Sequence, residues 1–351
     1  MKTILKSLVE PGMVLAKPVY YKDELIIDRN KVIDEADMVK LTRYAIQSVT
    51  VKEPEDLATS QMERIRLSPG YQEFEGNYNK FFPAYKSILI NFIEEKIPVN
   101  LQNLLTIYKK IIAGIENIED RLDYVYYRPP GKDDVTYEHC LNCAIISGVF
   151  GAWWHMNQEE LHTLILCGFF FDIGKLKLPK ELLEKTDKLS DFERNWLKTH
   201  AQVGYELLKE QNLNEHILNA TWMHHERKDG SGYPQHLKGD QIDEFARYIA
   251  IVDSYDAMTS PRSYRNAMPI FDVIMNFEET GYDRYDRDLI LPIIKNLAKT
   301  QIGRVVQLND HRKGIITDIS KLSYGKPIVS LQDGSKVDLY KCPELSICKY
   351  L

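Results

Sequence analysis

The spacing of apolar residues changes along this 351-residue chain, and that change most constrains its fold. From about residue 74 to 300, apolar residues recur every three or four positions, which predicts helices. Two such runs, FPAYKSILINFIEEKI and LQNLLTIYKKIIAGIENI, indicate a pair of antiparallel helices. From about residue 302 the period becomes two, in VVQL, GIITDI, PIVSL and KVDLY, with turn-like residues between these runs. The pattern predicts a long helical region followed by a small antiparallel barrel or sandwich of four or five strands.

The first 60 residues differ from both of these regions. MVLAKPVYY, ELIID and SVTV are strand-like, and ADMVKLTRYA has a helical pattern. The predicted fold class is therefore mainly α, with a helical bundle flanked by a small N-terminal α+β module and a small C-terminal all-β module. The predicted parts are an N-terminal module (1–60), a helical connector (61–130), the main helical domain (131–300) and a β-barrel-like module (301–351). Asn157 before Glu160 and Ser190 before Glu193 have the capping-box spacing that predicts helix starts.

Composition narrows the functional classes. Apolar residues make up 44% and charged residues 27%, as in a soluble globular protein, and the net charge of −6 gives no general attraction for a nucleic acid polymer. The first residues do not resemble a signal peptide and the five cysteines are an odd number, which predicts a cytoplasmic protein with reduced thiols. The longest apolar run, residues 161–174, is too short to span a membrane. Cys140 and Cys143 form a CxxC within an apolar helical pattern, which favours buried packing over zinc or redox chemistry.

Several histidines and aspartates lie at the ends or on the faces of predicted helices. Imidazole and carboxylate together suit iron, manganese or zinc, and helices of a bundle can project such ligands inward. Singly, His139 could be structural and Asp253 could be a core carboxylate with a partner, but the adjacent His224–His225 pair before the glycine-rich DGSGYP favours a site. The candidate metal ligands are His139, Asp172, His200, His224, His225 and Asp253.

The stretch from about residue 133 to 275 resembles the HD-GYP family of metal-dependent phosphohydrolases. HHERKDGSGYP matches the family signature, including Gly232-Tyr233-Pro234. The segments YEH, DIGK, LPKELLEK, THAQVGYELL, VDSYDAMTS and RSYR follow in the family's order and spacing. The resemblance covers about two fifths of the chain and implies a helical bundle around a site with two or three metal ions. It also implies hydrolysis of cyclic di-GMP, a bacterial second messenger in signal transduction, to pGpG and GMP.

The resemblance also implies roles for individual residues. One metal would be held by His139, Asp172 and Asp253, and a second by Asp172, His200, His224 and His225, with Asp172 bridging and catalytic. Lys175 would be catalytic by neutralising phosphate oxygens, and the residues meeting the nucleotide would be Lys175, Tyr233, Arg262 and Arg265. The expected cofactors are one or two divalent metal ions, iron or manganese, with zinc as the alternative.

One position departs from the family pattern. Where the family has a His-Asp pair this chain has Phe171-Asp172, and phenylalanine cannot ligate a metal. Val135 stands where some members place a glutamate that supports a third metal. Three functions stay open: a cyclic di-GMP phosphodiesterase weakened by the missing ligand, a non-hydrolysing cyclic di-GMP receptor or partner-binding signalling protein, and a phosphohydrolase of another nucleotide. Besides cyclic di-GMP, the expected partners are a second copy of the chain or a signalling protein.

Overall fold

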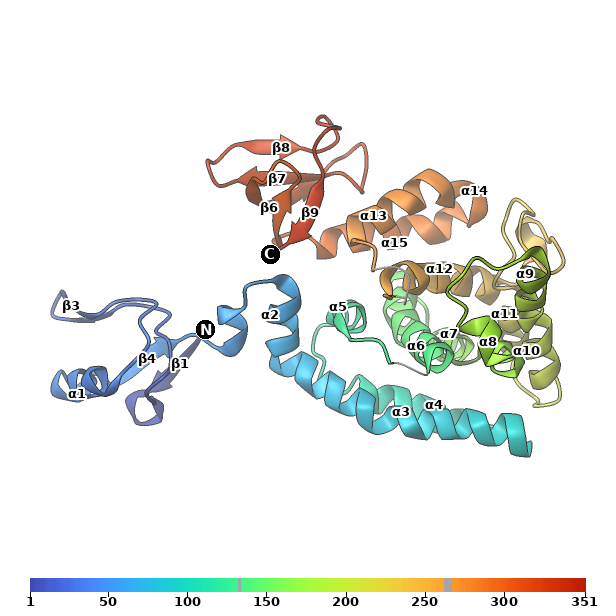
Figure 1. The fold of residues 1–351 in the computed structure, drawn as a ribbon, viewed down its shortest axis with the longest axis horizontal. Coiled ribbons are helices and arrows are strands. Elements are labelled where there is room, and N and C mark those ends of the chain that lie inside the picture. Colours follow the sequence, from blue (N-terminus) through green and yellow to red (C-terminus); the bar gives the residue numbers. More distant parts are fainter. Residues whose placement is uncertain (132–133, 262–266) are drawn as a thin grey trace. The chain divides into compact units, whose positions relative to one another are not determined.

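The computed structural model describes residues 1–131, 134–261 and 267–351. They form two compact units, Met1–Gln72 and Glu73–Leu351. The chain is mainly helical, with strands and a short helix near its N-terminus and a β-sheet near its C-terminus (Figure 1), so the predicted fold class is confirmed. The finer division into four parts stays a prediction.

The smaller unit contains two pairs of antiparallel strands and two short helices. Strand β1 (Lys2–Leu5) pairs with β4 (Ser48–Val51), and β2 (Val19–Tyr21) pairs with β3 (Glu24–Ile27). The helices are α1 (Glu35–Arg43) and α2 (Gln61–Leu67), with 3-10 turns η1 (Lys6–Leu8) and η2 (Pro54–Leu57). A core that includes Leu15, Ile33 and Leu41 is buried between them. The first predicted strand is shorter than expected, because the chain before Val19 makes only isolated bridges and Pro18 has no N–H to donate to a strand partner.

The larger unit is built from helices that run through most of its length. Their bounds are α3 (Pro69–Glu95, beginning in the smaller unit), α4 (Leu101–Ile111), α5 (Asp120–Tyr127), α6 (Val135–Trp153), α7 (Gln158–Phe170), η3 (Ile173–Lys177), α8 (Lys180–Leu183), α9 (Asp191–Lys198), α10 (His200–Leu208), α11 (Glu215–Met223), η4 (Gly239–Gln241), α12 (Glu244–Thr259), α13 (Ile270–Asn276), the π-helix η5 (Phe277–Gly281), α14 (Tyr282–Arg284) and α15 (Arg287–Thr300). Helix α6 packs on α7 and α12, and α11 packs on α7, α10 and α12. Fully buried aromatic side chains, including Phe150 and Phe169, fill this bundle.

Local signals explain where the helices that carry the site begin. The Asn157 side chain accepts hydrogen bonds from the N–H groups of Glu159 and Glu160 at the start of α7, and Ser190 caps α9 in the same way. Both predicted capping boxes are therefore confirmed. Helix α7 ends at Phe170, so that Phe171 and Asp172 lie in the turn between α7 and η3.

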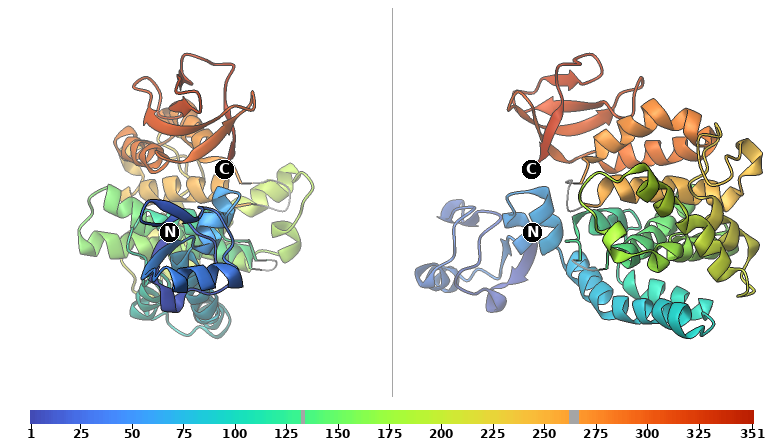
Figure 2. Two further views of the ribbon diagram at one scale, coloured as in Figure 1. Left: turned by 90° about the vertical axis from the view of Figure 1, so that its left-hand side faces the viewer. Right: turned by 45° about the vertical axis from the view of Figure 1, so that its right-hand side comes forward.

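The C-terminal strands form one antiparallel sheet, seen from two further sides in Figure 2. Its order is β8 (Lys336–Asp338), β7 (Pro327–Leu331), β6 (Lys313–Ile319), β5 (Val305–Leu308) and β9 (Ile347–Tyr350). Strand β9 carries no clear alternation in the sequence and was not among the predicted strands. Polar contacts join this part to the helices: Arg304 donates to the Asp123 carboxylate of α5, and the Glu278 carboxylate accepts hydrogen bonds that include the backbone N–H of Tyr324.

Cys140 and Cys143 are buried on α6 and form no disulfide, as the packing interpretation of the CxxC predicted. Among the helices of the described residues, none is long and apolar enough to cross a membrane.

Candidate metal centre

Five segments of the larger unit bring the predicted metal-binding residues together. His139 lies on α6, Asp172 follows α7, His200 begins α10, the His224–His225 pair follows α11, and Asp253 lies on α12. Asp172 and His224 are fully buried, and His200 and His139 nearly so. One ligand atom from each of Asp172, His200, His224 and His225 lies within 4.8 Å of the others.

A close approach between two backbones positions Asp172 against His200. A Cβ atom added at Gly174, in η3, would collide with the carbonyl oxygen of His200 and would lie 2.6 Å from the backbone nitrogen of Gly204. Only glycine allows η3 to pack this tightly on α10. The turn that follows α7 is therefore held so that the Asp172 side chain faces the His200 ring.

The two carboxylate oxygens of Asp172 face different groups of ligands. Its Oδ1 lies 3.2 Å from Nε2 of His200 and 3.6 Å from Nε2 of His224. Its Oδ2 lies 3.5 Å from Nε2 of His139 and also contacts the ammonium of Lys175. Asp172 thus stands between two sets of donors, which is the position of a bridging ligand.

The histidines on the Oδ1 side are oriented by backbone carbonyls. Nδ1 of His200 lies 2.6 Å from the carbonyl oxygen of Leu197, and Nδ1 of His224 lies 3.0 Å from that of Thr221. A carbonyl oxygen can only accept, so each Nδ1 carries the proton and each Nε2 presents a lone pair to the centre. Outer hydrogen bonds of this kind are typical of metal-binding histidines.

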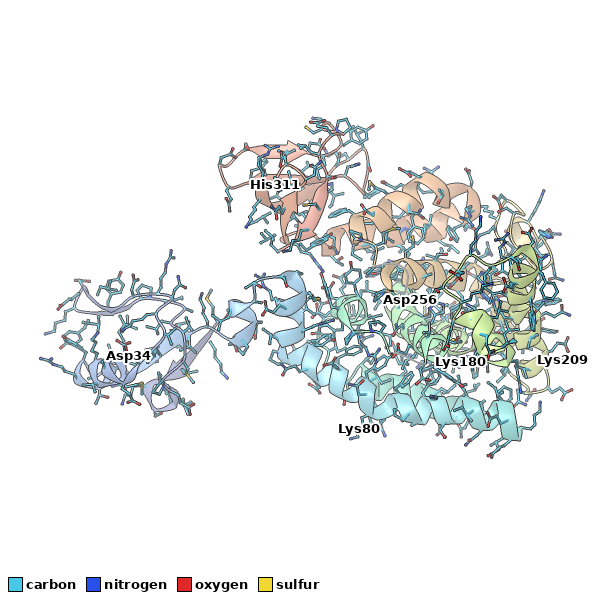
Figure 3. The ribbon with its side chains drawn as sticks, viewed as in Figure 1. Asp34, Lys80, Lys180, Lys209, Asp256 and His311 are labelled. Carbon is cyan, nitrogen blue, oxygen red and sulfur yellow. The ribbon has the colours of Figure 1, made fainter. Side chains whose placement is uncertain are left out.

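His139 is oriented by carboxylates instead. Its Nδ1 lies 2.6 Å from Oδ2 of Asp256, and its Nε2 lies 3.1 Å from Oδ1 of Asp253. Asp256, which Figure 3 labels on α12, is buried and was missed in the sequence. Its spacing of three residues from Asp253 places both carboxylates on one face of a helix, a signal that could have revealed it.

The charge states differ between the two sides. Burial lowers the pKa of His200 to about 3, and burial together with the neighbouring His224 and His200 holds the pKa of His225 well below its usual value, so both rings are neutral. Burial alone would lower the pKa of His139, but its hydrogen bonds to Asp253 and Asp256 raise it to about 9. Metal coordination at His139 would therefore have to displace a proton.

The carboxylate of Asp172 is ionised. Burial would raise its pKa, but the charge of Lys175 and interactions with the imidazoles of His224, His200 and His139 outweigh burial and hold that pKa well below its usual value. Among the described residues, Oδ1 of Asp172 is a buried atom that accepts no hydrogen bond. Neutral imidazoles with inward lone pairs around an unsatisfied carboxylate oxygen are a donor set that fits a divalent metal ion.

Phe171 lies beside this donor set. Its side chain is fully buried, and its ring makes edge-to-face contacts with His139 and His224, at centroid distances of 5.3 and 5.0 Å. The Phe171 ring therefore presents only carbon and its hydrogens to His139, on the Oδ2 side of Asp172, and to His224, on the Oδ1 side.

The segment after His225 folds back onto that histidine. The Tyr233 ring stacks on His225 at 4.6 Å between centroids, and the Lys198 ammonium lies 5.1 Å from the Tyr233 ring centre. The buried carboxylate of Glu226, a second residue that sequence reasoning missed, accepts the backbone N–H groups of Gln235 and Leu237. An acidic residue directly after the histidine pair is a signal that could have revealed it.

The remaining predicted nucleotide contacts are placed only in part. Lys175 lies at Asp172 and Tyr233 lies at His225, whereas Arg262 and Arg265 fall outside the described residues. Cys143, whose Sγ lies 3.8 Å from Nδ1 of His139, lines the outer side of that imidazole.

Comparison with known proteins identifies the segment that holds this centre. Residues 136–289 match the model of the HD domain family, a range that contains all six candidate ligands. The chain carries an HD domain of the HD-GYP family. The resemblance seen in the sequence is thereby confirmed.

Named relatives of this HD-GYP chain are phosphodiesterases. It is 28% identical to a cyclic di-GMP phosphodiesterase of Pseudomonas aeruginosa, over 53% of this chain and 45% of the relative. It is 25% identical to a cyclic di-GMP phosphodiesterase of Thermotoga maritima, over 75% of this chain and 68% of the relative. It is 34% identical to a 3'3'-cGAMP-specific phosphodiesterase of Vibrio cholerae, over 47% of this chain and 38% of the relative. The match thus spans less than half of two of these relatives and about two thirds of the third.

Proposed function

We propose that this chain is a metal-dependent phosphodiesterase that hydrolyses cyclic di-GMP to pGpG and GMP, with a rate reduced by Phe171. The observation that carries the proposal is the buried Asp172, whose two oxygens face two separate groups of imidazole and carboxylate donors. A cyclic dinucleotide is the substrate class named for each of the three relatives.

The proposed chemistry divides between the metal and the side chains. The one or two divalent ions bound here would act as Lewis acids on a phosphodiester and activate water. His139, His200, His224, His225, Asp172 and Asp253 would hold those ions. Iron or manganese is the proposed metal, with zinc as the alternative, because mixed imidazole and carboxylate donors suit all three.

Lys175 and Tyr233 have positions that suit binding of the substrate. The Lys175 side chain is partly exposed while its ammonium reaches Asp172, so it can place positive charge where a phosphate approaches the ligands. The Tyr233 ring, half-buried against His225, offers an aromatic surface next to the same ligands. Arg262 and Arg265 are proposed as further phosphate contacts from the sequence resemblance alone.

Phe171 favours a second candidate, a cyclic di-GMP receptor that binds without hydrolysis. A buried aromatic ring stands between His139 and His224, where it supplies no ligand. Such a centre could keep its nucleotide contacts and lose turnover.

A binding and turnover experiment separates these functions. The purified chain is loaded with Fe²⁺ or Mn²⁺, and cyclic di-GMP is followed by calorimetry and by chromatography of pGpG and GMP. Slow, chelator-sensitive turnover that disappears in His200→Gln supports the phosphodiesterase, and binding without products supports the receptor. The absence of both would contradict the two functions together. Hydrolysis of 3'3'-cGAMP or another nucleotide in place of cyclic di-GMP would reassign the substrate.

Variants of the proposed nucleotide contacts test the binding step. Tyr233→Ala is expected to weaken binding by ~1–3 kcal/mol, the contribution of one base stacked on an aromatic ring. Arg262→Ala and Arg265→Ala should each cost roughly 1.5–3 kcal/mol, because each would remove a charge-assisted hydrogen bond to phosphate. Lys209→Ala is a matched control, since Lys209 is an exposed cation that directly follows α10 and pairs with Glu206. Equal losses in all these variants would contradict the proposed contacts.

A further inference from the structure

The two sides of the candidate metal centre are unequal in what they offer a metal. On the Oδ1 side, His200, His224 and His225 join Asp172, and one ligand atom of each lies within 4.8 Å of the others. Nε2 of His200 and Nε2 of His224 lie 3.3 Å apart, both directed inward by hydrogen bonds on their opposite nitrogens. Two inward lone pairs at this distance repel unless a cation lies between them.

On the Oδ2 side, the protein supplies a cation of its own. The Lys175 ammonium contacts Oδ2 of Asp172, the same oxygen that faces Nε2 of His139 at 3.5 Å. Among the described residues, the candidate ligands that face this oxygen or its neighbour His139 are His139 itself, Asp172 and Asp253. The Phe171 ring contacts the His139 ring edge-to-face. The Oδ2 oxygen is therefore paired, whereas Oδ1 accepts no hydrogen bond from any described residue.

We infer that this chain holds a single tightly bound divalent ion, on Asp172 Oδ1, His200, His224 and His225, while the Lys175 ammonium serves as the cation at Asp172 Oδ2. This inference rests on the proposed function only in placing a metal at this centre. It assigns the one ion to a particular side and gives Lys175 a structural role in the resting protein. An ammonium has three N–H donors, so Lys175 can hold Asp172 and still meet a phosphate.

Metal content tests the assignment without any nucleotide. The purified full chain, loaded with Mn²⁺ and desalted, is expected to hold one equivalent per chain by plasma emission, with the electron paramagnetic resonance spectrum of an isolated ion. His200→Gln should lose this ion, whereas the matched variant His139→Gln should keep it. Circular dichroism and the melting temperature show whether each variant folds. Two equivalents in the parent, a spectrum of two coupled ions, or equal loss in folded His139→Gln and His200→Gln would overturn the inference.

A double-mutant cycle tests Phe171 and Lys175 together. Phe171→His supplies a fourth ligand beside Asp172, so the Oδ2 side should then bind a second equivalent. Lys175→Met should lower the melting temperature clearly in the parent, where Lys175 is the cation at Oδ2. In metal-loaded Phe171→His, Lys175→Met should lower the melting temperature less, because a metal ion there replaces the Lys175 ammonium at Oδ2. This difference between the two backgrounds should vanish when a chelator removes the metal. If Phe171→His stays at one equivalent, or if Lys175→Met has the same effect in both backgrounds, the inference is wrong.

These readouts separate the inference from the proposed function. A chain with one ion on the predicted side that neither binds nor cleaves cyclic di-GMP would leave the inference standing and contradict the proposed function. A chain with two tight ions and rapid cyclic di-GMP hydrolysis would contradict the inference and support the phosphodiesterase.

Discussion

At the scale of single residues, the buried Glu226 holds the segment that follows the His224–His225 pair. Its Oε1 accepts the N–H of Gln235 at 2.6 Å, and its Oε2 accepts the N–H of Leu237 at 3.0 Å. A carboxylate meets both donors with acceptor oxygens. Tyr233 lies in the segment between Glu226 and Gln235, so Glu226 also determines where the Tyr233 ring lies against His225.

Replacing Glu226 by Gln should therefore destabilise the helical unit by about 1–3 kcal/mol, because the amide turns an NH₂ group toward one backbone N–H and leaves that donor unsatisfied. Urea denaturation measures this difference. Glu184→Gln is the control: Glu184 is exposed and pairs with Lys180 on the surface, so the change should stay within about 0.5 kcal/mol. Equal effects of the two substitutions would show that the Glu226 hydrogen bonds do not hold the segment.

At the scale of elements, the contact between η3 and α10 sets the distance from Asp172 to His200. Gly174 faces the backbone of His200 and Gly204 with no room for a side chain. Gly76, on α3, has nothing within 4 Å of an added Cβ atom. The same substitution should therefore have opposite effects at these two positions.

Gly174→Ala should lower the free energy of unfolding by about 1–3 kcal/mol or more, because the backbones of η3 and α10 would have to move apart to make room for the methyl group. It should also reduce metal content, because the displacement separates Asp172 from His200. Gly76→Ala should instead raise stability by up to about 1 kcal/mol through the higher helix propensity of alanine. Thermal denaturation and plasma emission measure both. A Gly174→Ala protein with unchanged stability and metal content would mean that η3 does not set this distance.

At the scale of the whole molecule, the two units differ in the buried polar groups on which their stability depends. All six candidate ligands belong to the unit Glu73–Leu351, whereas the smaller unit buries Asp37 beside Lys31 and Lys40. Burial alone would raise the pKa of Asp37, but hydrogen bonds from Lys31, from the backbone of Asp34 and from Lys40 outweigh it and lower the pKa. The two units should therefore respond to different changes in solution.

Acid should destabilise the smaller unit through Asp37. Because the folded pKa of Asp37 lies below its unfolded value of about 4, its contribution is complete above that value and is lost as the pH falls through the folded pKa. Hydrogen exchange resolved by peptide should show protection of residues 1–72 decreasing in that range. Asp37→Asn should be less stable at neutral pH, with a difference from the parent that shrinks in acid. A difference that stays constant with pH would contradict this role for Asp37.

Chelation should act on the other unit. Metal that binds only the folded state at 100 times its Kd adds about 2.7 kcal/mol, so its removal should lower the protection of residues around the ligands on α6, α10 and α12. Protection in the smaller unit should be unchanged in the same experiment. Loss of protection in both units, or in neither, would contradict a metal centre confined to the helical unit.

The sequence by itself determined the features that follow local rules. The periods of three to four and of two predicted the helical region and the C-terminal strands, and the capping boxes at Asn157 and Ser190 predicted two helix starts. The HHERKDGSGYP segment and the order of the surrounding motifs identified the HD-GYP family. Each of these signals is a short run of residues or the order of such runs along the chain, so no tertiary contact is needed to recognise them.

Only the tertiary structure decided how the donors meet. Asp256 reaches His139 across 117 positions of the chain, and the two oxygens of Asp172 separate toward different histidines because η3 packs on α10. The contacts of Phe171 with His139 and His224, and of Lys175 with Asp172, likewise depend on which helices pack together. Side-chain direction in a buried centre is set by packing between distant segments, and a linear pattern does not contain that information.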